Sequence, residues 1–178
     1  LRLEGNYLTG EIPDSITNLH NLEVLKLNSN ELNGDIPDSI GRLMNLDTLW
    51  LNDNTLQGGL PPSITRLSGL INLRLELNNL TGEIPADIGD LSSIKYLRLD
   101  NNFLTGGIPV SIVNLTNLER LYLKDNNLSG QIPAAICDIE SLFIMWFHNN
   151  KLCPGDEGYP VCFPDYQIIQ QDTSDCPE

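Results

Sequence analysis

The sequence predicts a solenoid, in which one short unit is repeated along an axis, with a parallel β-sheet on one face and short helical turns on the other. The first observation is a set of asparagines at a constant interval of 24 residues, at Asn6, Asn30, Asn54, Asn78, Asn102, Asn126 and Asn150. The second is the apolar frame that recurs around each of them, as in LDTLWLNDNTLQG from Leu46 to Gly58. A fixed period of this length is typical of repeat architectures.

Each unit should begin with a short strand, because two leucines lie two residues apart and therefore point to the same face. These pairs are Leu25 and Leu27, Leu49 and Leu51, Leu73 and Leu75, Leu97 and Leu99, and Leu121 and Leu123. One coil cannot bury that face alone. Stacked coils can, with their strands paired in a parallel sheet about 4.8 Å apart.

The asparagine follows three residues after the second leucine, where the chain turns inward. Its side chain both donates and accepts hydrogen bonds, so a column of asparagines can satisfy the buried turns of successive coils. We call this column, formed by Asn30, Asn54, Asn78, Asn102, Asn126 and Asn150, the asparagine ladder. A glycine suited to a turn comes next. The proline after it, such as Pro61, should end any pairing, and Ile64 then fits one 3₁₀ or helical turn.

The spacing L-x-x-L-x-L-x-x-N-x-L-x-G-x-I-P resembles the plant-type leucine-rich repeat over roughly residues 1–152. The resemblance implies a right-handed α/β superhelix with a concave parallel sheet, and a role in recognition. Members of this family include ectodomains of receptor-like kinases and receptor-like proteins, and secreted inhibitors of pectin-degrading enzymes. The chain begins inside a repeat, at the pair Leu1 and Leu3, without an amino-terminal cap. We therefore expect it to be a fragment of a longer protein.

The repeat breaks near its end, so we divide the chain into a solenoid, residues 1–152, and a cysteine-containing cap, residues 153–178. An even number of clustered cysteines predicts disulfides and an oxidising, extracellular or cell-surface location. Cys137 and Cys162 are 25 residues apart and Cys153 and Cys176 are 23 apart, each close to one period. This spacing favours those two pairs. The rival, Cys153 with Cys162, stays open. Zinc is disfavoured because no C-x-x-C pair exists.

Charge and motifs exclude several classes of function. A net charge of −14 argues against nucleic-acid binding, and no apolar run is long enough to span a membrane. His20 and His148 are the only histidines and no catalytic motif is present, so we expect neither an enzyme nor a bound metal or cofactor. Sequons for N-glycosylation occur at Asn79, Asn114 and Asn127, and they matter if the protein is secreted in a eukaryote.

The residues that the repeat does not determine gather in three outward-facing columns on the concave face, one of which contains Glu76, Asp100 and Lys124. These columns contain six of the ten Lys/Arg residues but three of the 24 Asp/Glu residues. Exposed aromatic and arginine side chains are enriched at interfaces. We therefore predict a ligand-binding site made of Trp50, Arg74, Tyr96, Arg98, Arg120 and Tyr122, with Lys124 and Trp146 beside them.

Alternatives to that site and function remain. Arg74 with Glu76 and Arg98 with Asp100 lie two apart and could pair with each other, and Trp146 could belong to the cap. The leading function is the binding of a protein or peptide ligand. The second is inhibition of a polysaccharide-degrading, carbohydrate-active enzyme. A third is ice binding, although the slot before the glycine is uneven: Thr9, Asn33, Gln57, Thr81, Thr105, Ser129. The sequence names neither the ligand nor the oligomeric state.

Overall fold

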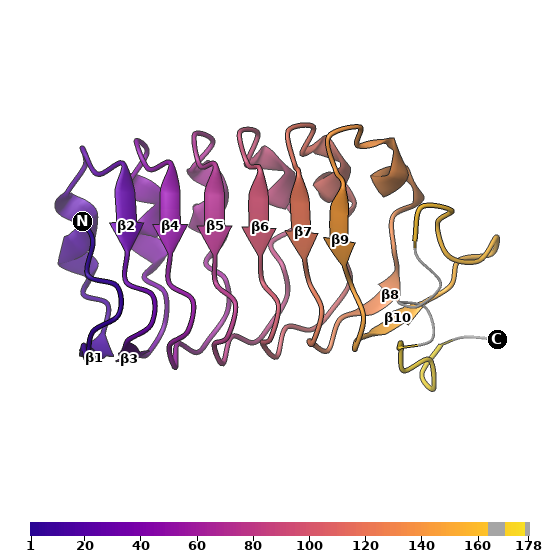
Figure 1. The fold of residues 1–178 in the computed structure, drawn as a ribbon, viewed down its shortest axis with the longest axis horizontal. Coiled ribbons are helices and arrows are strands. Elements are labelled where there is room, and N and C mark those ends of the chain that lie inside the picture. Colours follow the sequence, from indigo (N-terminus) through magenta and orange to yellow (C-terminus); the bar gives the residue numbers. More distant parts are fainter. Residues whose placement is uncertain (164–169, 177–178) are drawn as a thin grey trace.

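The computed structural model describes residues 1–163 and 170–176. Its coils stack side by side along the long axis of the molecule, and their strands form one face (Figure 1). The six-stranded parallel sheet has the order β2-β4-β5-β6-β7-β9. Its strands are β2 (Val24–Lys26), β4 (Thr48–Trp50), β5 (Asn72–Arg74), β6 (Tyr96–Arg98), β7 (Arg120–Tyr122) and β9 (Ile144–Trp146). The predicted fold class is confirmed.

The register of this sheet follows the 24-residue period. Leu49 lies opposite Leu73, which lies opposite Leu97, and the three are fully buried. The residues on either side of each buried leucine are only partly buried, because successive strand residues point to opposite faces. The leucines and isoleucines of successive coils form one continuous core, so each coil is stabilised by its neighbours.

Short 3₁₀ helices lie behind the sheet, as predicted (Figure 1). They are η1 (Asp14–Asn18), η2 (Asp38–Arg42), η3 (Pro62–Arg66), η4 (Ile88–Asp90), η5 (Val110–Asn114) and η6 (Ala134–Asp138). Five of the six begin directly after a proline. The isoleucine of each turn faces the core and its carbonyl accepts a bond from the following leucine or isoleucine, as when Leu43 N donates to Ile40 O at 3.1 Å. A few residues therefore suffice to return the chain to the sheet.

A second, smaller pairing was not predicted. Before each proline the chain forms short parallel contacts, between β1 (Thr9–Glu11) and β3 (Glu31–Asn33) and between β8 (Ser129–Gln131) and β10 (Lys151–Cys153). The partners are offset by 22 residues, as in Thr9 opposite Glu31, whereas the main sheet is offset by 24. We call these contacts, with the bridges Asp35–Gln57 and Glu83–Thr105, the second ladder. The prolines do end pairing, but only after the second ladder. The sequence does contain an alternation of apolar residues that fits this pairing. Leu32 and Ile36 lie two residues before and two residues after Gly34, and both are buried.

Neighbouring 3₁₀ turns approach each other so closely at Gly89 that a side chain there would collide with the next coil, and this gives a prediction about stability. A Cβ on Gly89 would lie 2.2 Å from the carbonyl oxygen of Ser111 in the next coil. We expect Gly89→Ala to lower the free energy of unfolding by about 1–3 kcal/mol, because the two turns must separate. Urea denaturation measures this. Gly69→Ala is the matched control, since nothing lies within 4 Å of its Cβ. Equal effects at the two glycines would contradict this account of the packing.

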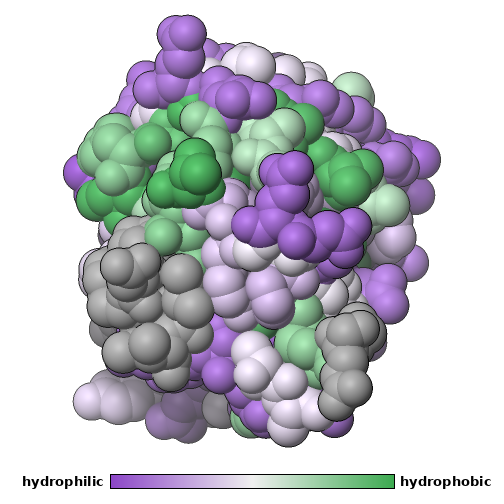
Figure 2. All heavy atoms as spheres, turned by 90° about the vertical axis from the view of Figure 1, so that its right-hand side faces the viewer, coloured by the Kyte–Doolittle hydropathy of each residue, from purple (hydrophilic) through white to green (hydrophobic). Residues whose placement is uncertain are grey.

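The carboxyl-terminal end closes the core with rings and disulfides. Phe147 is fully buried and packs on Phe163, which stacks on Tyr159. The structure contains the disulfides Cys137–Cys162 and Cys153–Cys176, each with a Cα–Cα distance of 5.6 Å, which is the pairing favoured by the spacing. Apolar side chains still gather on the upper part of this end (Figure 2). Within the described residues, no helix has the length and apolar character needed to cross a membrane.

Candidate functional site

Neighbouring strands of the sheet form a small hollow of about 230 Å³ on the concave face. We call it the concave hollow. Its lining residues are Asn72 and Arg74 from β5, Tyr96 and Arg98 from β6, and Arg120 and Tyr122 from β7. Five of these six belong to the predicted ligand site. The structure thus brings most of that set together, adds Asn72, and leaves Trp50 outside the hollow.

Two arginines of the concave hollow are already paired within the chain. Arg74 donates to Glu76 and Arg98 Nη1 lies 3.2 Å from Glu76 Oε1. Arg98 also contacts Asp100 at 3.2 Å. Burial lowers the pKa of Arg98, but the hydrogen bond and charge of Asp100 together with the charge of Glu76 outweigh it and raise that pKa above its usual value. The pairing within single strands, which the sequence allowed, is therefore present.

The carboxylates of Glu76 and Asp100 are more buried than the sequence predicted. Glu76 is 2% exposed and Asp100 is 1% exposed, whereas we expected both to face outward with the rest of the column. The strands β5 and β6 end at Arg74 and Arg98, so the alternation of faces stops before these residues. The carboxylates instead lie beneath the guanidinium groups, whose side chains keep 27% and 30% exposure.

Arg120 differs from the other arginines of the concave hollow. Its guanidinium carbon lies 5.4 Å from the ring centre of Tyr96 and 5.5 Å from that of Phe143. Among the described residues it makes no ion pair, and its Nε has no hydrogen-bond partner. Arg120 is consequently the arginine here whose charge is least compensated.

Aromatic rings extend the hollow toward the cap. Tyr122 meets Trp146 edge to face at 5.1 Å, and the guanidinium of Arg98 lies over Tyr122 at 4.7 Å. Trp146 is 38% exposed, so it belongs to the sheet face, while its neighbour Phe147 enters the core. The ammonium of Lys124 lies 5.5 Å from the Trp146 ring and 3.1 Å from Asp125.

Trp50 occupies a different environment from the rings of the hollow. The ammonium of Lys26 lies 3.3 Å from the centre of its ring, and the guanidinium of Arg74 lies 4.9 Å from it. Its indole N–H is buried without a hydrogen-bond partner. Cations of this chain therefore already cover the ring, and Trp50 is not among the residues that line the hollow.

The asparagine ladder holds in position the coils that carry the concave hollow. Asn102 Nδ2 donates to the carbonyl oxygens of Leu99 in its own coil and Leu75 in the preceding coil, both at 3.1 Å. Its Oδ1 accepts from the N–H of Leu80 at 3.0 Å. Asn30, Asn54, Asn78, Asn126 and Asn150 repeat this pattern. Each asparagine thus fixes the position of one coil against another.

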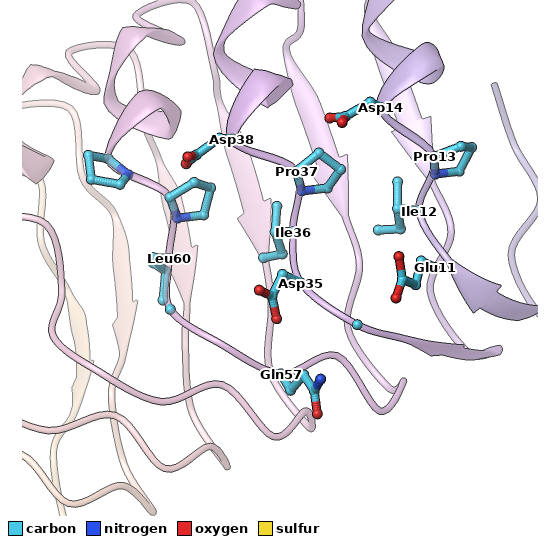
Figure 3. Close-up of a pocket in the computed structure, with 14 residues that line it drawn as sticks. Glu11, Ile12, Pro13, Asp14, Asp35, Ile36, Pro37, Asp38, Gln57 and Leu60 are labelled. Atoms are coloured by element: carbon cyan, nitrogen blue, oxygen red, sulfur yellow. The ribbon is translucent and has the colours of Figure 1, made fainter.

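A larger hollow, of about 630 Å³, lies on the other side of the coils near the amino-terminal end. Figure 3 shows Glu11, Asp14, Asp35 and Asp38 along it, with Ile36 between them. These four acids are exposed to solvent, and Asp14 accepts a bond from Ser39 at 2.7 Å. Within the described ranges, no group of three or more His, Cys, Asp or Glu residues could hold a metal ion.

An open sheet face with a polar and aromatic hollow, on a rigid stack of coils, defines a repeat scaffold of the kind that binds a partner along one surface. Matches to a protein-family model agree with this repeat architecture. The chain belongs to the Leucine Rich Repeat family, whose model matches residues 1–19, 21–43, 45–67, 93–115 and 117–139.

Solved structures similar to the chain include plant receptors and one ice-binding protein. The ectodomain of the receptor kinase GASSHO1/SCHENGEN3 from Arabidopsis thaliana, in complex with CASPARIAN STRIP INTEGRITY FACTOR 2, is 37% identical over 83% of this chain, with a TM-score of 0.81. The plant peptide hormone receptor RGFR1, in complex with RGF2, is 32% identical over 85%, with a TM-score of 0.83. A plant ice-binding protein is 29% identical over 85%, with a TM-score of 0.69.

The matched region is only part of each of those proteins. The chain spans 18% of the GASSHO1/SCHENGEN3 chain, 24% of the RGFR1 chain and 57% of the ice-binding protein. A search of the curated proteins finds no significant match.

Proposed function

We propose that the chain is part of an extracellular, receptor-like module whose concave face binds an extended peptide. The concave hollow carries this proposal, because it gathers Tyr96 from β6 with Arg120 and Tyr122 from β7 into one open site. Two similar receptors have structures with a named bound partner, and the two disulfides suit an oxidising extracellular environment.

The dimensions of the sheet support an extended ligand. Six strands about 4.8 Å apart cover about 24 Å, which is close to the length of seven extended residues. Tyrosine rings can cover apolar groups of such a peptide. Because Glu76 and Asp100 already neutralise Arg74 and Arg98, the ligand needs one acidic or hydrogen-bond-accepting group, placed opposite Arg120.

The experiment selects binders from a displayed library of random twelve-residue peptides on the immobilised chain, and then measures their affinity for variants. We expect Arg120→Ala to weaken binding by about 2 kcal/mol or more, roughly 30-fold, if this arginine anchors the ligand. Tyr122→Ala should also weaken it. Surface plasmon resonance with synthetic peptides measures both dissociation constants.

The matched control is Arg66→Ala, which removes an exposed arginine from η3 on the opposite side of the coils. Its effect on affinity should be less than about twofold, since arginines outside an interface contribute little to binding. Peptides that bind Arg120→Ala and Tyr122→Ala as well as the unaltered chain, or that lose affinity with Arg66→Ala, would overturn the assignment to the concave face.

Ice binding is a second candidate, favoured by the similarity to a plant ice-binding protein. A flat regular array of small hydroxyl or amide side chains would serve that function. The corresponding column here is uneven, because the longer Gln57 precedes Thr81, Thr105 and Ser129. Gln57 and Thr105 lie in isolated bridges of the second ladder. Thermal hysteresis of the purified chain tests this candidate directly, and its presence would displace peptide binding as the leading function.

A further inference from the structure

A surface away from the concave hollow carries two sequons on either side of an exposed phenylalanine. Three consecutive coils read NLT from Asn79, FLT from Phe103 and NLS from Asn127. The N–H of Phe103 donates to Leu80 O at 2.8 Å, and the N–H of Asn127 donates to Leu104 O at 2.8 Å. The three residues therefore occupy the same place in neighbouring coils.

The Phe103 ring is exposed although the leucine that follows it is buried. Phe103 is 53% exposed, whereas Leu80 and Leu104 are fully buried and hold the backbone in place. Asn79 and Asn127 are exposed as well, and neither side-chain amide makes a hydrogen bond within the described part of the chain. The ring thus has an amide available for modification in the coil on each side.

We propose that Asn79 carries an N-linked glycan whose first N-acetylglucosamine packs its apolar face on the ring of Phe103. The sequon is Asn79-Leu80-Thr81, and Thr81 is exposed beside it. The donor is a lipid-linked oligosaccharide diphosphate. A bond forms between Asn79 Nδ2 and the anomeric carbon, the bond from that carbon to the diphosphate oxygen breaks, the lipid diphosphate leaves with the electron pair, and the amide nitrogen releases one proton.

Geometry places the first sugar close to the ring. Neighbouring coils are about 4.8 Å apart, so a sugar attached to Asn79 begins within one coil spacing of Phe103. The C–H groups on one face of a pyranose can cover an aromatic ring and remove its apolar surface from water. This surface of the solenoid would then be covered by carbohydrate, while the concave hollow on β5, β6 and β7 stays open to a ligand.

The test uses proteins with a single sequon, secreted from eukaryotic cells. One protein keeps Asn79 and carries Asn114→Gln and Asn127→Gln. The matched control keeps Asn114, an exposed residue at the end of η5, and carries Asn79→Gln and Asn127→Gln. Intact mass gives the occupancy of each sequon. An endoglycosidase then leaves one isotopically labelled N-acetylglucosamine on each protein for NMR.

We expect occupancy of Asn79, and an upfield ring-current shift of the sugar protons on Asn79 relative to those on Asn114. Phe103→Leu, which keeps an apolar side chain without a ring, should abolish that shift. The sugar on Asn79 should also raise Tm by at least about 2 °C in a chain of this size, and this gain should disappear with Phe103→Leu. An unoccupied Asn79, or sugar shifts that do not change with Phe103→Leu, would overturn the proposal.

Discussion

Replacing Asn102 by alanine should lower the free energy of unfolding by about 3 kcal/mol, because the buried N–H of Leu80 loses its only partner. The carbonyls of Leu75 and Leu99 each lose one of their two asparagine donors at the same time. Asn102 is 6% exposed. The alanine cannot bond the carbonyl of Leu75 or the N–H of Leu80, and water has little access to either group. The loss falls between coils, so the effect should exceed that of removing one hydrogen bond at the surface.

Urea denaturation followed by circular dichroism measures this change, with Asn33→Ala as the control. Asn33 is an exposed asparagine in β3, and its side chain forms no hydrogen bond among the described residues, so its loss should change stability by less than about 0.5 kcal/mol. If the two variants were equally stable, the asparagine ladder would not have the structural role that its hydrogen bonds indicate.

Removing the disulfide Cys137–Cys162, by Cys137→Ser with Cys162→Ser, should cost a similar amount, about 3 kcal/mol in the chain-entropy model. The link closes a separation of 25 residues and holds Phe163 against Phe147 at the end of the core. Thermal unfolding measures the loss of stability. Hydrogen exchange should show where it occurs, with faster exchange in the last coils around Phe147.

The central coils provide the internal reference for that experiment, since each coil contacts mainly its neighbours. Exchange of the β5 and β6 amides should stay close to that of the unaltered chain. Uniformly faster exchange along the whole solenoid, or an unchanged Tm, would contradict a stabilising role confined to the carboxyl-terminal end.

Much of the fold could be predicted because each position of the repeat has a local physical role that recurs. The buried Leu73 and the bonds of Asn78 follow from the spacing of the repeat. Separations near one period favoured the cysteine pairing that the structure contains, although they left one rival pairing open. The second ladder could not be predicted from Pro37, because a proline shows where pairing ends but not that three paired residues precede it.

The site was less predictable, because it depends on how side chains arrange after the strands end. Glu76 follows β5 by two residues and is buried beneath Arg74, so its column could not be assigned from alternation. Leu77 shows the same limit. Its φ of +58° is left-handed, a conformation that suits the Asp or Asn found at this position in four other coils. A leucine at this position gives no indication of that conformation. The sequence likewise did not show that Trp50, on β4, lies outside a hollow lined by residues of β5, β6 and β7.

The bonds from each ladder asparagine into the preceding coil also restrict how the length of such a chain can vary. Asn102 reaches Leu75, 27 residues earlier, and Asn126 reaches Leu99 at the same separation. An insertion of one residue between β7 and Asn126 would therefore displace the Asn126 amide from its acceptors, because this segment has no loop that could take up the extra residue. A duplicated or deleted segment of 24 residues keeps all of these separations. Gain and loss in whole coils is thus the change in length that this architecture accommodates, and it lengthens or shortens the concave face by one strand at a time.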